Sequence, residues 1–120
     1  MEIKNARIQS TSLTMADHGC LTFWLHLEGD DWGCGFGGYC IGFGYLGADE
    51  FRAENGNGLV AMMRIMDVAG VEEWEQLKGK LIRVKTGGWG DGIKEIGNII
   101  EDKWFNIETF FQEKQKENRP

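Results

Sequence analysis

Apolar and polar residues alternate most regularly between Leu21 and Glu28. The period of two places the apolar side chains of this segment on one face, which predicts a half-buried β-strand. These apolar residues are Leu21, Phe23, Leu25 and Leu27. The segment Glu2–Leu13 follows the same pattern more loosely, and Trp32–Ile41 is expected to return antiparallel. Turns at residues 17–19 and 29–31 complete a three-stranded meander, because Gly and Asp favour tight turns.

A helical period replaces the strand period between Leu59 and Ala69. The apolar residues recur at intervals of three and four, which predicts an amphipathic helix. The apolar stripe consists of Leu59, Met62, Met63 and Met66. We expect this stripe to be buried against the apolar face of the strand 21–28. Asn55 or Asn57 is suited to cap the start of the helix, and Gly70 is suited to end it.

The sequence after this helix predicts a short helical turn and a hairpin. Apolar residues in the segment 71–77 indicate the turn, and the segments Lys80–Thr86 and Ile93–Ile100 indicate the hairpin. A bulge at Gly97 is expected in the second strand, because the isoleucines of that strand do not share one parity.

The C-terminal segment combines a capping residue with an apolar patch. Asn106 is suited to begin a helix whose apolar residues are Ile107, Phe110 and Phe111. Residues 113–120 are rich in Lys, Glu and Gln, so we expect a solvated or frayed tail. The resulting order is βββ-α-ββ-α within a single domain covering residues 1–120. This order predicts the α+β class, with an antiparallel sheet and helices packed on one face.

The charge balance and the cysteines limit the possible setting of the protein. The chain carries 13 basic and 19 acidic residues, and its formal net charge is -6. Direct binding of nucleic acid is therefore disfavoured, because phosphate contacts require a basic surface. The sequence has no apolar stretch of signal-peptide or membrane-spanning length, and its 3 cysteines, an odd number, fit reduced thiols. We therefore expect a cytoplasmic protein that does not act at a membrane.

The most unusual segment runs from Trp32 to Gly47 and mixes glycines with aromatic residues. Glycine weakens a strand, so this density suggests that another group approaches the backbone closely. One interpretation is a ligand-binding surface, where backbone N–H groups hold anionic oxygens and rings stack on a base. The other is a bulged strand whose aromatic side chains cover glycines on a neighbouring strand. The candidate ligand-binding residues of this segment are Gly35, Phe36, Gly37, Gly38 and Tyr39.

A second glycine-rich loop and two arginines complete the candidate site. Trp89 lies within the loop 87–92, where it could form a flap over a ligand, a packing lid or a contact between subunits. Arg64 and Arg83 are candidate cations for a bound phosphate. Each of these arginines points either to solvent or into a cleft, and the sequence leaves both alternatives open.

Catalytic and metal-binding motifs are weak in this chain. His18 and Cys20 would lie on the same side of an extended segment, but no nucleophile, base and orienting group are readable together. The spacing of His18, Cys20, Cys34 and Cys40 matches no recognised zinc motif. We therefore predict no catalytic residue, no metal site and no cofactor.

Several short motifs together resemble a family of small bacteriophage and prophage proteins. They are Ser12-Leu13, Asp17-His18-Gly19, Leu21-Thr22-Phe23, Gly35-Phe36-Gly37-Gly38-Tyr39, Val71-x-x-Trp74-Glu75-x-Leu77-Lys78-Gly79-Lys80, Ile82-Arg83-Val84 and the stretch from Ile96-Gly97 to Trp104-Phe105-Asn106. The resemblance implies a phage accessory protein and supplies no established activity. Accessory proteins of this size often counter host defence, by binding a host protein or by trapping a nucleotide signal.

Two functions follow from these observations. The first is a non-enzymatic binder that sequesters a nucleotide-derived defence signal, supported by the clustered glycines and aromatic residues. The second is an acidic inhibitor of a host protein, supported by the net charge and the Glu72-Glu73-x-Glu75 cluster. In either case we expect a homo-oligomer, because a small monomer would struggle to cover aromatic residues near glycine-rich edges.

Overall fold

The computed structural model describes residues 2–53, 55–87 and 92–117. The first strands are β1 (Glu2–Asp17), β2 (Cys20–Gly29), β3 (Trp32–Gly44) and β4 (Phe51–Ala53), and they are followed by helix α1 (Asn57–Ala69). The 3-10 turn η1 (Trp74–Leu77) leads into strands β5 (Leu81–Thr86), β6 (Glu95–Gly97) and β7 (Trp104–Asn106), and then into helix α2 (Ile107–Glu117).

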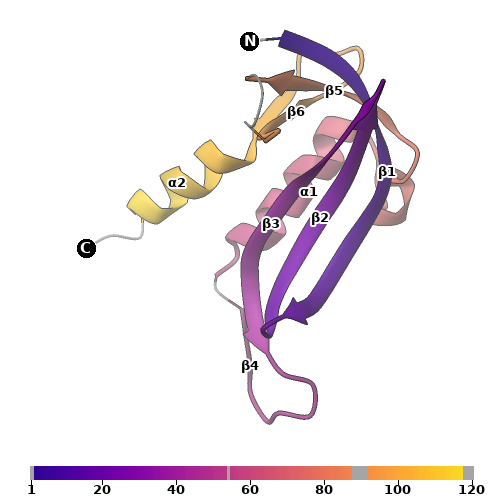
Figure 1. The fold of residues 1–120 in the computed structure, drawn as a ribbon. Helices are drawn as coiled ribbons and strands as arrows, with labels where there is room; N and C mark the ends of the chain where they lie inside the picture. The colour runs from indigo at the N-terminus through magenta and orange to yellow at the C-terminus, as the bar shows by residue number, and fades with distance from the viewer. Residues whose placement is uncertain (1, 54, 88–91, 118–120) are drawn as a thin grey trace.

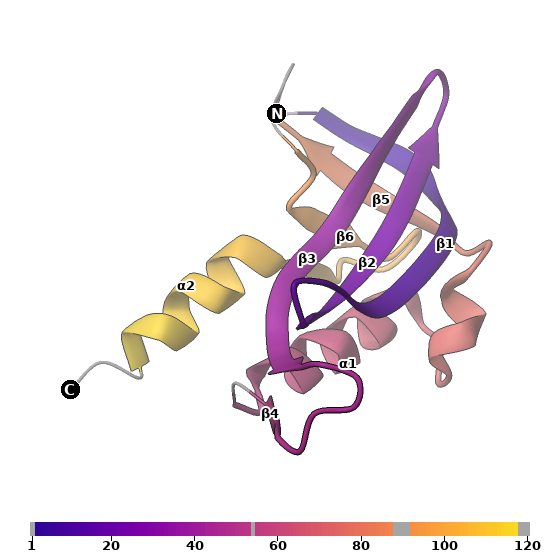
Figure 2. The ribbon, with the colours of Figure 1, turned by 60° about the horizontal axis from the view of Figure 1, so that its bottom comes forward.

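The strands form one 7-stranded antiparallel sheet in the order β4-β3-β2-β1-β5-β6-β7. The long strands β1, β2 and β3 form the predicted meander, and α1 lies behind them in Figure 1. Figure 2 shows α1 below the same strands and α2 projecting away from the sheet on the side of β3. The predicted α+β class, an antiparallel sheet with helices on one face, is therefore confirmed.

Residues that tolerate a left-handed backbone make the two turns of the meander. His18 and Gly19 have φ values of 53° and 80°, and Asp31 has a φ of 62°. Two consecutive positive φ angles suit a two-residue hairpin turn, because they match the right-handed twist of the flanking strands. The strands themselves extend further than predicted, with β1 reaching Asp17 and β3 reaching Gly44.

Helix α1 packs on the sheet through small and branched residues. Its buried residues are Gly58, Ala61, Ile65, Val68 and Ala69. In the core they join the side chains that the alternating strand pattern predicted to be buried, including Phe23, Leu25 and Leu27. As predicted, Gly70 ends the helix in the left-handed conformation, with a φ of 79°.

The predicted orientation of the methionine stripe on α1 was wrong. Leu59 and Met63 are both 65% exposed, whereas Met62 and Met66 are partly buried at the margin of the core. The physical reason is close approach between the helix and β3. A β-carbon on Gly58 would lie only 2.5 Å from the β-carbon of Ile41, so a larger residue does not fit at that contact.

The second strand of the C-terminal hairpin is shorter than predicted. β6 pairs with β5 as expected, but it ends at Gly97 and not at Ile100. The side-chain oxygen of Asn98 accepts the N–H groups of Ile100 and Glu101, each at 2.9 Å, and this turns the chain into β7. The predicted bulge at Gly97 was also wrong, because β5, β6 and β7 pair there in continuous register.

Helix α2 begins where the sequence predicts it. The side-chain oxygen of Asn106 accepts the N–H of Thr109 at 2.9 Å, which caps the helix. The ring of Phe110 then packs edge-on against Phe105, with 5.5 Å between the ring centroids. The helix continues to Glu117 with a largely exposed surface, so the described part of the predicted tail is solvated and helical.

Candidate functional site

The glycines of the predicted ligand surface lie under a ring of the neighbouring strand. A β-carbon on Gly35 would lie 2.9 Å from the Trp24 ring, and one on Gly38 would lie 2.3 Å from it. Gly37 and Gly38 have positive φ values of 117° and 83°, and the register of β2 against β3 shifts nearby. β3 is therefore a bulged strand with covered glycines, but the covering ring comes from β2 and not, as predicted, from β3.

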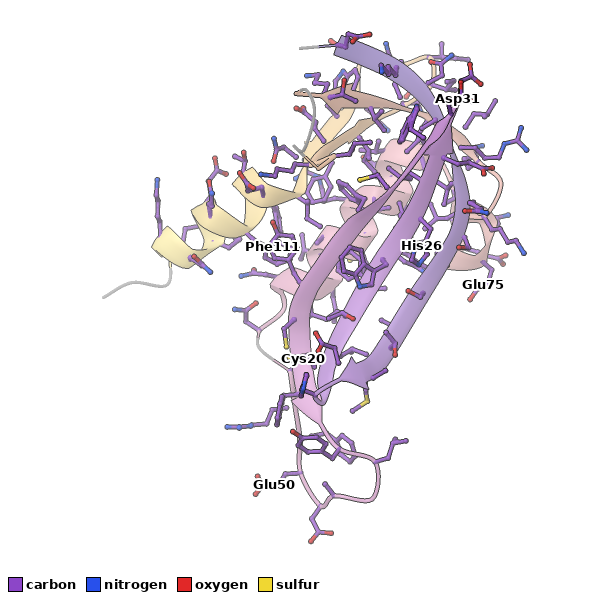
Figure 3. All side chains as sticks on the ribbon, in the orientation of Figure 1. Cys20, His26, Asp31, Glu50, Glu75 and Phe111 are labelled. Atoms are coloured by element: carbon purple, nitrogen blue, oxygen red, sulfur yellow. The ribbon has the colours of Figure 1, made fainter. Side chains whose placement is uncertain are left out.

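Phe36 and Tyr39 point to the helix side of the sheet. Phe36 is 0% exposed and belongs to the core, so its ring is not available to stack on a ligand. Tyr39 is half-buried, and its ring stacks on Phe111 of α2 with 4.4 Å between the centroids (Figure 3). Burial raises the pKa of Tyr39, the charge of Glu108 raises it further, and Lys94 acts in the opposite direction. Tyr39 thus joins β3 to α2.

Arg83 is engaged with the turn between β6 and β7. Its Nε donates to the carbonyl oxygen of Asn98 at 2.7 Å, and its Nη2 donates to that of Glu101 at 2.8 Å. The guanidinium also lies 4.8 Å from the ring centre of Trp104, which is a cation–π distance. These contacts assign Arg83 a structural part in holding the turn.

The remaining predicted residues do not converge on Tyr39 and Arg83. The guanidinium carbon of Arg64 lies 5.2 Å from the ring centre of Phe105, on the α1 side of the sheet. Trp89 lies outside the described residues. Among the described candidates, Phe36 is in the core, a β-carbon on any of the three glycines would lie within 3 Å of a neighbouring atom, and the two arginines contact different aromatic rings.

A polar hollow of about 170 Å³ lies beside Tyr39, between β3, the start of α1 and α2. Its lining includes the side chains of Asn55, Asn57 and Lys114. Lys114 is already paired, since its Nζ lies 3.3 Å from a carboxylate oxygen of Glu117. The hollow therefore offers amides and a phenol, together with one cation that a local carboxylate partly neutralises.

A larger groove of about 280 Å³ lies between the start of α1 and the ends of β1, β2, β3 and β4. Its apolar lining comes mainly from Met15, Leu21, Ile41, Phe51 and Leu59. Phe51 is 58% exposed, and Leu59 is exposed to a similar degree. We call this feature the apolar groove. Apolar side chains left open in this way are typical of surfaces that meet another molecule.

One flank of α1 extends the apolar groove along the helix. At 100° per residue, Leu59, Met62, Met63 and Met66 fall on the same side of α1, next to its buried face. We call these four residues the methionine flank. Leu13 of β1 is 53% exposed and shares the helix-facing side of the sheet with its cross-strand neighbour Phe23.

Carboxylates stand at both ends of this apolar surface. Asp17, Asp49 and Glu50 adjoin the strand ends that form the apolar groove, and all three are exposed. Glu72 and Glu75 are exposed around η1, beyond the other end of α1. Figure 3 shows Glu50 at the lower tip of the molecule and Glu75 well apart from it, on the right-hand side. The surface thus has an apolar centre and acidic ends.

The apolar groove is not predictable from the sequence pattern, because that pattern does not reveal β4. Without that strand Phe51 has no defined position, and it becomes a wall of the groove only when β4 pairs with the end of β3. A signal for the methionine flank was nevertheless present in the sequence. Ala61, Ile65 and Val68 recur with the same helical period as the methionines, so α1 has two adjacent apolar faces and the sheet covers one.

The histidines and cysteines do not assemble a reactive centre among the described residues. His18 Nδ1 lies 2.8 Å from Asp17 Oδ1 in an exposed turn, and His26 Nε2 lies 3.5 Å from Ser12 Oγ. Within residues 2–53, 55–87 and 92–117, no three His, Cys, Asp or Glu side chains are placed to hold a metal ion. Over the same residues, no helix combines the length and the apolar character needed to cross a membrane.

The chain matches no protein-family model, no curated protein and no solved structure. The surfaces described above are therefore the basis for inferring a function. Of these, the apolar groove with the methionine flank is the most exposed apolar feature, whereas the predicted ligand-binding residues are covered or dispersed.

Proposed function

We propose that this protein is a non-enzymatic binding protein that acts on a protein partner through the apolar groove and the methionine flank. The observation that carries the proposal is the exposure of Leu59 and Met63, each 65%, beside a groove that Phe51 and Leu59 leave open. Full burial of such a side chain contributes about 1.5–3 kcal/mol. A partner that covers several of them would gain the central apolar contacts on which protein interfaces depend.

This proposal adopts the acidic inhibitor as the better of the two functions that the sequence suggests. The net charge of -6 disfavours direct nucleic-acid binding and favours a partner with a basic surface. The phage accessory setting, the counter-defence role and the cytoplasmic location belong to the same proposal. They rest on the resemblance and on the odd number of cysteines.

A nucleotide-derived ligand is the second candidate, and the polar hollow beside Tyr39 is the observation that favours it. Tyr39, Asn55 and Lys114 could contact a small polar molecule there. The hollow of about 170 Å³ is smaller than the roughly 300–1,000 Å³ of most ligand pockets. We therefore place this function second.

We also propose that the protein forms a homo-oligomer through the edge of β3. β3 contains no charged residue, and β4 covers only Gly42–Gly44 of its outer edge. Charges, prolines or bulges usually prevent an edge strand from pairing with another chain. β3 has neither a charge nor a proline, and the bulge at Gly37 and Gly38 interrupts only part of its edge. Light scattering tests this point, and a mass of 13.6 kDa at high protein concentration would contradict it.

The experiment that tests the main proposal compares matched variants as bait in bacterial host lysate. Leu59→Asp/Met63→Asp alters the methionine flank, and Val60→Asp alters an exposed apolar residue of the same helix that lies outside this flank. We expect at least one host protein to be captured by the wild type and by Val60→Asp, and to be lost from the flank variant. Titration of that purified host protein must then reproduce the difference.

A different pair of results would contradict the proposed protein-binding function. If every captured protein is retained by the flank variant, and a nucleotide is released from the purified protein by heat, the proposed protein-binding function is wrong. The nucleotide-derived ligand then becomes the leading function.

A further inference from the structure

We infer that the occupant of the apolar groove is a basic amphipathic helix of the partner, lying on the sheet beside α1. This inference rests on the proposed function and names the chemistry of the partner. Three independent features of the described surface support it: the uncovered part of the sheet, the methionines, and the carboxylates at both ends.

The first feature is an unfilled position in the helical layer. α1 contacts β3, β6, β7 and η1, and η1 covers part of β1 and β2, with Trp74 edge-on against Phe23. Leu13 of β1 remains exposed on the helix-facing side of the sheet. Neighbouring helices pack about 8–10 Å apart, whereas neighbouring strands are about 4.8 Å apart, so one helix covers roughly two strands. A second helix beside the first half of α1 would therefore cover Leu13 and the end of the sheet that α1 and η1 both leave open, next to the apolar groove.

The length of the surface suits a helix of moderate length. α1 has 13 residues, which corresponds to about 20 Å along its axis. A partner helix of about 13–14 residues would span the same distance in three to four turns. Its apolar residues, three or four apart, would meet Leu59, Met63 and Leu13 on either side.

The second feature is the predominance of methionine on the flank. Methionine is unbranched and flexible, so Met62, Met63 and Met66 can adapt to the ridges of an incoming helix. Surfaces rich in methionine commonly accept helices of differing sequence for this reason. Met15, on the floor of the groove, extends the same adaptable surface to β1.

The third feature is charge complementarity. Exposed Asp17 and Glu50 stand near one end of the surface, and exposed Glu72 and Glu75 stand beyond the other. Arg52, which lines the groove, opposes this charge at one end, and exposed Lys78, directly after η1, opposes it in part at the other. A partner helix with Lys or Arg at both ends and an apolar centre would fit this distribution, and an acidic helix would be repelled.

The same charges argue against a second copy of this chain as the occupant. α1 carries Arg64 and Asp67 and is neutral, and α2 carries more glutamates than lysines. Neither helix is basic, so neither complements the acidic ends. A homo-oligomer through the edge of β3 leaves the methionine flank unoccupied, because that edge is a different surface.

The test uses three fluorescent synthetic peptides of about 14 residues. One is an amphipathic Leu/Lys helix, one has the same pattern with Glu in place of Lys, and one has the Leu/Lys composition in scrambled order. Anisotropy titrations are run with the wild type, with Leu59→Ser/Met63→Ser and with Val60→Ser as the matched control. A fourth variant, Glu72→Lys/Glu75→Lys, reverses the charge at one end.

We expect the patterned Leu/Lys peptide to bind at least about tenfold more tightly than the other two peptides. The flank variant should lose about tenfold or more in affinity, the end variant several-fold, and Val60→Ser nothing measurable. Methyl NMR signals of Met15 and Met63 should shift in the complex with the wild type.

The outcomes separate this inference from the proposed function. Equal binding of the Glu and Lys peptides, or binding that the flank variant does not weaken, overturns the basic-helix inference. If no peptide binds while flank-dependent capture of a host protein persists, the inference is wrong and the proposed function stands. If the flank variant instead abolishes self-association in light scattering, the occupant is a second copy and the inference is again wrong.

Discussion

The two apolar faces of α1 differ in the size of their residues and in what covers them. The buried face consists of Gly58, Ala61, Ile65, Val68 and Ala69. The residues of the adjacent methionine flank have longer side chains. Met62 and Met66 lie at the margin of the core, and Leu59 and Met63 are exposed to solvent. Both faces have the period of an amphipathic helix, so hydrophobicity alone does not distinguish them. The difference shows that close approach to the sheet, and not apolar character, selected the buried face.

The uncovered flank is apolar without being needed for the fold. Leu59 and Met63 could be polar at little cost to the core, because most of each side chain faces solvent. An apolar residue in that position contributes to stability only when another molecule covers it. α1 therefore has a folding face and, under the proposed function, a binding flank, and each of the following changes tests that division.

The largest expected effect is on the folding face. Ile65 is 0% exposed, so Ile65→Asp would bury an unpaired carboxylate and should abolish cooperative folding. Ile65→Ala should retain the fold and lower the free energy of unfolding by about 2–5 kcal/mol. Urea unfolding followed by circular dichroism measures both. A loss below about 1 kcal/mol for Ile65→Ala would mean that α1 does not pack through this face.

A smaller loss is expected where the helix touches β3. In Gly58→Ala the new β-carbon would lie 2.5 Å from the β-carbon of Ile41, so the helix or the strand must move. Overpacking costs about 1–3 kcal/mol, which exceeds the gain of up to about 1 kcal/mol in helix propensity. Gly92→Ala is the control, because a β-carbon at Gly92 meets no atom within 4 Å. Greater stability for Gly58→Ala in urea unfolding would contradict the close approach.

The binding flank should tolerate a polar residue. Met63→Ser is expected to change the free energy of unfolding by no more than about 0.5 kcal/mol, because exposed substitutions rarely do more. The same change should weaken capture of the host protein in the lysate assay described above. Thermal unfolding of Met63→Ser beside Ile65→Ala gives the direct contrast. A comparable loss of stability in the two variants would remove the distinction between the faces.

The smallest effect concerns the contact of Tyr39 with Phe111, another covered aromatic surface. The folded state raises the pKa of Tyr39, chiefly by burial and then through Glu108, so it favours the neutral phenol. The preference for the neutral phenol therefore makes its whole contribution to the free energy of unfolding below the unfolded-state pKa, about 10. This contribution is lost as the pH rises through the folded-state pKa. Tyr39→Phe should make the urea midpoint fall less between about pH 8 and about pH 11 than it falls in the wild type.

Tyr45→Phe is the control for this pH series, because the Tyr45 ring is 55% exposed in the loop after β3. Identical pH dependence for Tyr39→Phe and the wild type would show that α2 does not cover Tyr39 in solution.

Local patterns predicted the meander, its turns, the end of α1 and the start of α2 because those features depend on neighbouring residues. The predicted cap of α1 was wrong, because Gly56 precedes the helix without a side-chain capping hydrogen bond. The alternation of Leu21, Phe23, Leu25 and Leu27 defines one face of β2 whatever lies across it. Gly70 and Asn106 act on their own turns of backbone, through a left-handed φ and a side-chain cap. β6 failed this kind of prediction because Asn98 redirects the chain through two side-chain hydrogen bonds that the isoleucine pattern does not reveal.

The candidate ligand residues show where pattern alone was insufficient. Glycines beside aromatic residues are consistent with either a pocket or a covered strand, and only the position of Trp24 across Gly35 and Gly38 distinguishes them. Arg83 looked available for a phosphate, but the carbonyl oxygens of Asn98 and Glu101 occupy its donors. Each of these partners lies on another segment, so the local sequence does not specify the contact.

Residue spacing along a regular backbone is enough to predict the α+β class, the apolar face of β2 and the helical period of α1. Tertiary structure decided which side of α1 is buried, because that choice depends on the distance between Gly58 and Ile41, two residues on different elements. It also decided that Leu59 and Met63 remain exposed on the same side of the sheet as Leu13, next to the apolar groove. Exposure of this kind is set by packing across the whole chain, and the period of the helix is compatible with either face.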